Sequence, residues 1–189
     1  MFRKLLEIDR DASYALHVAE KPGRLRSFAM FFAHSGDSWF WGIGLMLLWL
    51  PAWWFGNTFW MRWPVYELFW ISFTAAFVMA LKFTIRRQRP QGEWGAIYRT
   101  TDPHSFPSGH AARSFLIAAL AVYLGPVWLA VLLCIWAPLV SLARVAMGVH
   151  YLSDVIAGAI VGVALAWVAA QVSEPIFTTI GHWIGFMLY

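Results

Sequence analysis

Residues 114–143 read SFLIAALAVYLGPVWLAVLLCIWAPLVSLA, a stretch without Asp, Glu, Lys or Arg that Gly125-Pro126 interrupts. A helix that crosses a membrane needs about 20 largely apolar residues. The stretch is therefore too short for two full spans unless both helices extend into the polar sequence on either side. We expect one helix from residue 108 to 124 and another from 127 to about 147. This assignment places the flanking polar residues inside helix ends.

Three other apolar windows predict the remaining spans. Residues 38–61 carry no charge and give a first span that we expect to end near residues 51–56. Residues 65 to about 85 give a second span, and residues 150 to about 172 give a fifth. We expect Glu174-Pro175 to end the last of these, because proline interrupts helical hydrogen bonding. Residues 176–189 are apolar but short, so an interfacial helix and a sixth span both stay open. The expected fold is an all-α integral membrane bundle of about five transmembrane helices.

The composition also indicates a protein that lies mostly in lipid. Hydrophobic residues make up 60% of the chain and charged residues 13%, whereas soluble domains carry about 25% charge. Many of the 13 tryptophans lie near the ends of apolar segments, as in an interfacial aromatic belt. We expect one domain, with an interfacial N-terminal segment over 1–37, a transmembrane core over 38–173 and a C-terminal interfacial or short membrane helix over 174–189. Mixed charged and apolar spacing over residues 1–33 favours surface helices in the first segment.

The first polar motif lies at the end of the second predicted span. Lys82 and Arg89 are seven residues apart, which is two helical turns, although Pro90 disfavours helical geometry at Arg89. Arg offers a bidentate fork to a phosphate and Lys a mobile point charge. The alternative is snorkelling of long basic side chains to the interface, and that is the better interpretation for Arg86 and Arg87. Together with the other motifs, Lys82 and Arg89 favour a phosphate clamp.

The second motif, Pro107-Ser108-Gly109-His110, directly precedes an apolar helix. Serine is a preferred N-cap residue, and a helix start presents free N–H groups that bind anions. Ser108 and Gly109 can therefore cap the helix, hold phosphate oxygens, or do both. His110 by itself is more typical of a hydrogen-bonded core histidine. Arg113, one turn further on, either contacts a headgroup or anchors the helix at the interface.

The third motif pairs a histidine with a carboxylate. His150 and Asp154 are four residues apart, so on a helix they share one face and the carboxylate can accept the imidazole Nδ1–H. That bond would leave Nε2 free as a nucleophile, and the alternative is a purely structural pair. Gly148 lets the chain turn, which would bring Arg144 from the end of the preceding helix to the same place.

If the chain reverses at every span, all three motifs meet at one membrane face. Ionisable residues at membrane depth are costly and are usually paired or functional. Three cations, two histidines and a carboxylate at the ends of apolar helices favour a site that holds and cleaves a phosphate ester.

In this order and with these spacings, residues 82–154 resemble the type 2 phosphatidic acid phosphatase superfamily, whose pattern reads K-x6-R-P, P-S-G-H and S-R-x5-H-x3-D. The resemblance implies that His150 attacks phosphorus to form a phosphohistidine, oriented by Asp154, and that His110 protonates the leaving oxygen and later activates water. It also implies a set of phosphate-binding residues: Lys82, Arg89, Ser108, Gly109 and Arg144. The sequence departs from the pattern at Ala143, where the family usually has Ser.

The implied activity is a metal-independent lipid phosphatase without a cofactor. Glu93, Asp102 and Asp154 do not form an obvious metal cluster by spacing. The loop over residues 91–106 would overhang the site and is the candidate for headgroup selection. Substrates compatible with such a site are phosphatidate-like lipids, phosphatidylglycerol phosphate and polyprenyl mono- or diphosphates, and residues 107–113 are similar to the polyisoprenoid diphosphate phosphatase branch.

Two other functions stay open: a vanadate-binding, haloperoxidase-like enzyme and a non-catalytic membrane transport or binding protein. We expect a lipid phosphate and the bilayer as partners and no nucleic acid, while the sequence leaves the oligomeric state open. Many family members work on the extracytoplasmic face of a cell membrane. Here the active face would also carry the basic N-terminal residues, which favours the cytoplasm: Arg3, Lys4, Arg10, Lys21, Arg24 and Arg26.

Overall fold

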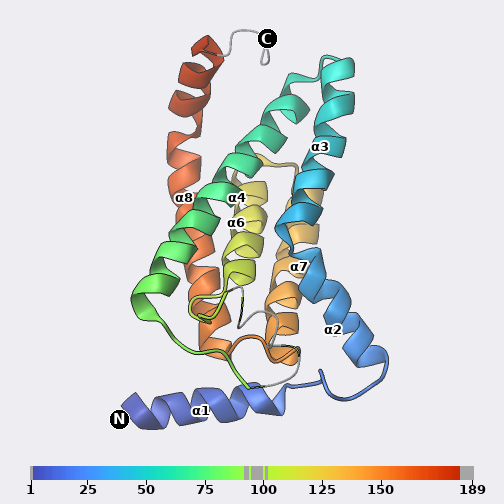
Figure 1. Ribbon diagram of the computed structural model, residues 1–189. Helices are drawn as coiled ribbons and strands as arrows, with labels where there is room; N and C mark the ends of the chain where they lie inside the picture. The colour runs from blue at the N-terminus through green and yellow to red at the C-terminus, as the bar shows by residue number, and fades with distance from the viewer. Residues whose placement is uncertain (1, 92–93, 95–99, 101, 184–189) are drawn as a thin grey trace.

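The computed structural model describes residues 2–91, 94, 100 and 102–183, and this part of the chain forms helices without a regular strand. The helices are α1 (Phe2–Ala15), α2 (Arg24–Ser35), α3 (Ser38–Trp54), α4 (Thr58–Ile85), α6 (Gly109–Leu124), α7 (Val127–Ala146) and α8 (Leu152–Trp183). Figure 1 shows α3, α4, α6, α7 and α8 running roughly along one direction, with α1 lying across one end of this bundle. The expected all-α bundle is confirmed.

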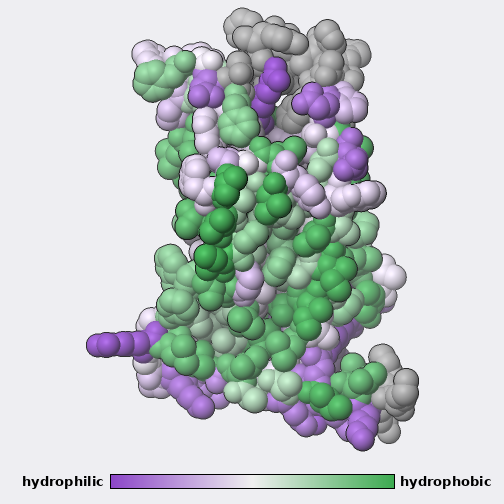
Figure 2. Space-filling view, turned by 180° about the vertical axis from the view of Figure 1, so that it is seen from behind, coloured by the Kyte–Doolittle hydropathy of each residue, from purple (hydrophilic) through white to green (hydrophobic). Residues whose placement is uncertain are grey.

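The outer surface of the bundle is that of a membrane protein. Three helical stretches are long and apolar enough to cross a bilayer: Phe59–Ile85, Val127–Ala146 and Leu152–Pro175. Figure 2 shows hydrophobic residues over the middle of one face and hydrophilic residues gathered towards its two ends. Large apolar side chains of three helices, among them Phe69, Val131 and Ile160, are exposed. The helices therefore bury only part of their apolar surface against one another and leave the rest to lipid.

The predicted break at Gly125-Pro126 separates α6 from α7, and Ser108 is the N-cap of α6 as its position predicted. The end of α8 differs from the prediction. We expected Glu174-Pro175 to end this helix, but α8 continues through Pro175 to Trp183. A proline removes one hydrogen bond, and a long membrane helix tolerates that loss. Residues 176–183 thus extend α8 instead of forming a separate helix, and residues 184–189 lie outside the described part.

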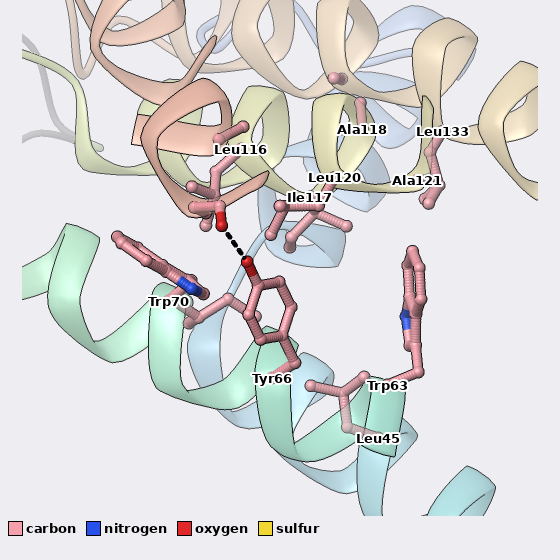
Figure 3. Close-up of a cluster of buried hydrophobic side chains, with 14 residues drawn as sticks. Leu45, Trp63, Tyr66, Trp70, Leu116, Ile117, Ala118, Leu120, Ala121 and Leu133 are labelled. Carbon is pink, nitrogen blue, oxygen red and sulfur yellow. Dashed lines mark hydrogen bonds between the residues drawn. The ribbon is translucent and has the colours of Figure 1, made fainter. Parts of the chain in front are cut away.

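The core of the bundle is built around α6. Leu116, Ile117 and Leu120 are almost completely buried there, between residues of α4, α7 and α8. The Tyr66 hydroxyl of α4 donates a 2.6 Å hydrogen bond to the carbonyl oxygen of Ala169 in α8, and Figure 3 shows this bond beside the aliphatic cluster. A polar tip that finds a backbone partner lets an aromatic ring be buried without an unsatisfied hydroxyl.

Two glycines bring α8 into backbone contact with the first turns of α6. A Cβ atom at Gly158 would lie 2.5 Å from the carbonyl oxygen of Ser108, and one at Gly162 would overlap the carbonyl oxygen of Ala112. Small residues allow this close approach of membrane helices. The contact fixes the start of α6, which carries Ser108 and His110, against the start of α8, which follows His150.

Replacing Gly162 with alanine should therefore lower stability, because the new methyl group cannot fit without separating α6 from α8. Overpacking of this kind costs about 1–3 kcal/mol. The matched control is Gly44→Ala in α3, where a Cβ meets nothing within 4 Å and the better helix propensity of alanine is neutral or favourable. Thermal unfolding in detergent measures both variants. Equal melting temperatures would show that the α6–α8 contact is not tight.

Candidate active site

His150 lies in the short turn between α7 and α8 and is 1% exposed. Gly148 has φ +67°, and this left-handed conformation lets the chain reverse directly before the histidine. The Nδ1 atom of His150 lies 3.4 Å from Oδ2 of Asp154, which also accepts the Tyr151 backbone N–H at 2.9 Å. On the opposite side of the ring, Nε2 lies 3.2 Å from Nη1 of Arg89. The structure thus places a carboxylate at one ring nitrogen and a cation at the other.

The surroundings of His150 keep its imidazole neutral. Burial lowers the pKa of His150 well below 6.5, and the charges of Arg89, Arg144 and Lys82 lower it further. Desolvation and like charges both disfavour the imidazolium form. A neutral ring with Nδ1–H directed at Asp154 carries its lone pair on Nε2, the atom that faces the cations.

Lys82 and Arg89 converge although they do not share a helix. The helix α4 ends at Ile85, with Lys82 in its last turn. Both cations contact Oδ2 of Asp102: the Arg89 Nη2 atom lies 2.7 Å away, and Lys82 Nζ is the other partner. Arg89 also donates through Nη1 to the carbonyl oxygen of Val149 at 2.9 Å. The Asp102 carboxylate therefore pairs with two of the cations that the sequence predicted to bind phosphate.

Asp102 is a residue whose position the sequence did not reveal. We had assigned it to the loop over residues 91–106 that would select a headgroup. In the structure its side chain lies in the cation cluster, and the sequence around Asp102 has no periodicity that predicts this contact. Glu93, Tyr98 and Arg99 of the same loop lie outside the described residues.

The start of α6 lies against the start of α8. The Ser108 hydroxyl accepts the Ala111 N–H at 3.4 Å, and the Ser108 N–H donates to the carbonyl oxygen of Asp154 at 2.9 Å. Gly109 is the first residue of the helix. Because the first N–H groups of a helix have no partner within it, this end of α6 presents donors next to the His150–Asp154 pair.

Arg144 completes the group of cations. It lies in the last turn of α7 and is 2% exposed, and its charge acts on His150. The preceding residue, Ala143, packs with Ala29 and Ala33 of α2. Ala143, where the family usually has Ser, therefore packs in an apolar contact between α7 and α2.

The structure gives Arg113, the candidate headgroup contact or interfacial anchor, partners within the protein. Its guanidinium is buried and donates to the carbonyl oxygen of Gly36, at 3.0 Å from Nε, and to the Ser38 hydroxyl, at 2.6 Å from Nη1. These partners lie at the corner between α2 and α3. Asp37, at the same corner, contacts Nε2 of His110 at 2.7 Å. Asp37 is a further site residue that sequence reasoning missed.

Arg87 is not a snorkelling residue, which corrects the interpretation made from the sequence. Its Nη1 atom donates to Oδ1 of Asp154 at 2.7 Å, and its Nη2 atom donates to Oδ2 of Asp9 in α1 at 2.7 Å. Asp9 Oδ1 in turn accepts the Ser153 N–H, and Ser13 accepts the Leu152 N–H, both at 2.9 Å. Two side chains of α1 therefore cap the start of α8.

No group of three or more His, Cys, Asp or Glu side chains is placed to hold a metal ion among the described residues. The site is instead a cluster of paired charges with two histidines.

Residues 63–177 match the family model of the PAP2 superfamily. The chain belongs to the PAP2 superfamily. It is 35% identical over 110 residues to an undecaprenyl-diphosphatase of Sulfolobus acidocaldarius, covering 55% of this chain and 53% of that protein. It is 41% identical over 63 residues to a lipid A 4'-phosphatase of Bacteroides thetaiotaomicron, covering 33% of this chain and 28% of that protein. The matches thus span about half the length of the first relative and less of the second.

Two solved structures share the fold of this PAP2 chain. A transmembrane PAP2 type phosphatidylglycerolphosphate phosphatase from Bacillus subtilis superposes with a TM-score of 0.73 at 23% identity, covering 92% of this chain and 88% of that one. LpxE from Aquifex aeolicus superposes with a TM-score of 0.63 at 24% identity, covering 88% of this chain and 94% of that one. The helical architecture is therefore that of PAP2 membrane proteins.

Replacing Arg87 with glutamine should loosen α1 and lower the melting temperature, because Asp154 and Asp9 lose their shared cation. Since the Arg87 side chain is 20% exposed, we expect a loss of about 1–2 kcal/mol, less than for a fully buried pair. The matched control is the neighbouring Arg86→Gln, whose Nε donates only within its own turn, to the Phe83 carbonyl oxygen. Thermal unfolding and the rate of tryptic cleavage at Arg10 report the effect. Equal behaviour of the two variants would contradict the predicted docking of α1.

Proposed function

We propose that this PAP2 protein is a metal-independent lipid phosphatase that hydrolyses a phosphomonoester or diphosphate through a phosphohistidine intermediate. The observation that carries the proposal is the buried, neutral His150, with Nδ1 at Asp154 and Nε2 beside Arg89. A nucleophile oriented by a hydrogen-bonded carboxylate and aimed at a cation-lined position suits attack on an anionic phosphoryl group. The superfamily membership and the names of the relatives agree with this chemistry.

The reaction proceeds in two steps. In the first, His150 Nε2 forms a bond to phosphorus while the bond to the lipid oxygen breaks, and His110 gives a proton to that oxygen. In the second, His110 takes a proton from water as its oxygen attacks the phosphohistidine, and the bond between phosphorus and His150 breaks to release phosphate. Each proton transfer by a positioned side chain contributes typically 10²–10⁴ in rate.

The cations stabilise the charge on the equatorial oxygens of the transferring group. Lys82, Arg89 and Arg144 supply fixed positive charge, while Ser108 and Gly109 supply the start of α6 as an anion site. A phosphate bound by Lys82 and Arg89 takes over the charge compensation that Asp102 provides in its absence.

The position of the site favours a lipid substrate. The motif residues lie at the ends of apolar helices, so a phosphate at the membrane interface can reach them while its tail stays in lipid. Phosphatidate-like lipids, phosphatidylglycerol phosphate and polyprenyl mono- or diphosphates all meet this condition. The relatives named above act, by their names, on lipid-linked phosphates of differing headgroup and tail, so the common feature is the lipid phosphate itself.

The charge distribution favours the cytoplasmic face for this site. The helix α1 lies at the same end of the bundle as the site, through Asp9 and Ser13, and the basic N-terminal residues belong to this end. Arg62, near the start of α4, is the basic residue towards the opposite end. Lys and Arg in short segments beside spans are retained on the cytoplasmic side.

Phosphate release by the detergent-purified protein in excess EDTA tests the function. We expect release from at least one of phosphatidate, phosphatidylglycerol phosphate, polyprenyl monophosphate and polyprenyl diphosphate. His150→Ala should reduce the rate at least about 10³-fold, because a covalent nucleophile and its transition state are lost. The control variant, His182→Ala, changes a histidine that has no assigned chemistry.

Equal phosphate release by His150→Ala and the unmodified protein would contradict the mechanism. Substrate flux without phosphate release would favour transport, and halide oxidation with added vanadate would favour the haloperoxidase-like alternative.

In the pH profile of kcat/KM, the half-maximal rate on the acid side should lie below pH 6.5. The nucleophile must be neutral, and burial with the neighbouring cations holds the pKa of His150 well below that value in the free enzyme. The profile of kcat/KM reports ionisations of the free enzyme, after division by the separately measured ionisation of the substrate phosphate. On the acid side of the profile, activity should therefore fall only as the pH drops below 6.5. A half-maximal rate above pH 6.5 on the acid side would contradict the predicted environment of His150.

A further inference from the structure

Asp37 occupies the N-cap position of α3, but its side chain does not cap this helix. An N-cap aspartate ordinarily accepts a backbone N–H from the first turn. Here Oδ1 lies 2.7 Å from Nε2 of His110 in α6, and Oδ2 lies 3.1 Å from Nδ1 of His34 in α2. The carboxylate therefore gives up a local interaction in favour of two imidazoles from other helices.

The corner that carries Asp37 is fixed from several sides. Arg113, three residues after His110, binds the Gly36 carbonyl oxygen and the Ser38 hydroxyl, which are the neighbours of Asp37 on each side. Trp41 Nε1 donates to the Ser35 carbonyl oxygen at 3.1 Å, and Trp136 Nε1 of α7 donates to the Ser35 hydroxyl at 2.9 Å. The position of the carboxylate is thus set by α3, α6 and α7 together.

Gly36 allows the corner to approach the histidine ring. A Cβ atom at this position would lie 2.8 Å from Cγ1 of Val140 and 3.2 Å from Cδ2 of His110. Contacts of this length would push the corner away from α6 and α7. The corner at Gly36 is therefore tightly packed against α6 and α7, and this packing places Asp37 next to His110.

The charges around His110 give Asp37 a chemical role. Arg113 of its own helix and Arg144 of α7 act on His110 as like charges, and Asp37 acts as an opposite charge. The other titratable partner of the Asp37 carboxylate, His34, is half-exposed. Burial raises the pKa of Asp37, but the hydrogen bonds and charges of His110 and His34 outweigh it and hold this pKa below its usual range. Burial and the charges of Arg144 and Arg113 disfavour the imidazolium form of His110, and the ionised Asp37 carboxylate at 2.7 Å opposes them when the ring takes up a proton.

We propose that Asp37 is the positioning residue of His110: it accepts the Nε2–H, fixes the tautomer and stabilises the imidazolium, so that Nδ1 exchanges the catalytic proton. This inference rests on the proposed function, in which His110 is the acid and base. In the first step the Nδ1 proton goes to the lipid oxygen as its bond to phosphorus breaks. In the second step Nδ1 recovers a proton from the attacking water, so that one proton is lost and regained in each turnover.

The two histidines then have separate carboxylate partners and opposite proton states. His150, with Asp154 at Nδ1, must be neutral to attack, while His110, with Asp37 at Nε2, must be protonated to assist departure. Burial and the neighbouring cations disfavour the imidazolium form of both rings, and Asp37 opposes this effect at His110.

The test compares two substrates that differ in their need for an acid. A long-chain alkyl phosphate leaves as an alkoxide and needs the proton, whereas a chain-matched nitrophenyl phosphate leaves as a stabilised phenolate and does not. Asp37→Asn should lose about 10²-fold or more on the alkyl substrate, the scale of general acid catalysis, and less than about 10-fold on the nitrophenyl substrate. The ratio of the two rates is independent of the fraction of protein that folds.

A second readout is the alkaline side of the kcat/KM profile with the alkyl substrate. Removing the anion beside His110 disfavours its imidazolium form, so Asp37→Asn should move the alkaline limb to lower pH. Asp11→Asn, which neutralises an exposed aspartate of α1 that pairs with Arg10 on the surface, is the matched control and should leave both the limb and the rate ratio unchanged.

Two results would overturn the inference. Equal losses on both substrates with an unmoved alkaline limb would mean that Asp37 only holds the corner. The same would follow if His34→Gln, which removes the other partner of the carboxylate, reproduced the full effect of Asp37→Asn. His150→Ala separates this failure from that of the proposed function. If His150→Ala is inactive and Asp37→Asn leaves the rate ratio unaffected, only the inference is contradicted. If His150→Ala is active, the proposed function is contradicted.

Discussion

The buried carboxylate of Asp154 is the interaction on which the site and its surroundings depend. Its two oxygens contact His150, the Tyr151 N–H and Arg87, and its backbone carbonyl oxygen accepts the Ser108 N–H. An ionised carboxylate near the hydrocarbon region is stable only when charges and donors compensate it. That requirement joins the start of α8 to the start of α6, to the segment after α4 and, through Arg87 and Asp9, to α1.

Compensation of charge explains the rest of the polar end as well. The cations of the first motif, Lys82 and Arg89, contact the Asp102 carboxylate, and His110 contacts the Asp37 carboxylate. Cations this close together repel one another, and the Asp102 carboxylate offsets part of that repulsion. Together with burial, the same cations disfavour the charged form of His150. In the proposed mechanism, one network of paired ionic groups therefore sets phosphate binding, the nucleophilicity of His150 and proton transfer by His110.

Close contacts between helix backbones fix the positions of these ionic groups. Gly158 lets α8 contact the first turn of α6, and Gly36 lets the α2–α3 corner contact His110. Both glycines act by the absence of a side chain, one between two long helices and the other at a corner held by Arg113. Residues remote from the chemistry thus determine how far the reacting groups lie from one another.

The sequence by itself determined the class of the fold and supplied the three motifs of the candidate site. Apolar windows of membrane length, with polar motifs at their ends, predicted helices whose boundaries agree with α3, α6 and α7 to within a few residues, and the alternation of direction predicted that the motifs meet at one end. It also predicted that Ser108 caps α6 and that His150 pairs with Asp154. It did not predict the passage of α8 through Pro175, because lipid and long helices tolerate a proline that local rules treat as a stop.

Only the tertiary structure decided the partners of these residues. Asp9 with Arg87, Asp37 with His110 and Arg113 with the α2–α3 corner are contacts between segments 73 to 78 residues apart in the chain. Hydrophobic periodicity shows which face of a helix is apolar, but it carries no information on which charged side chain lies opposite. The sequence therefore provided the groups that can do the chemistry, and the packing of helices distant in the chain decided which carboxylate serves which base.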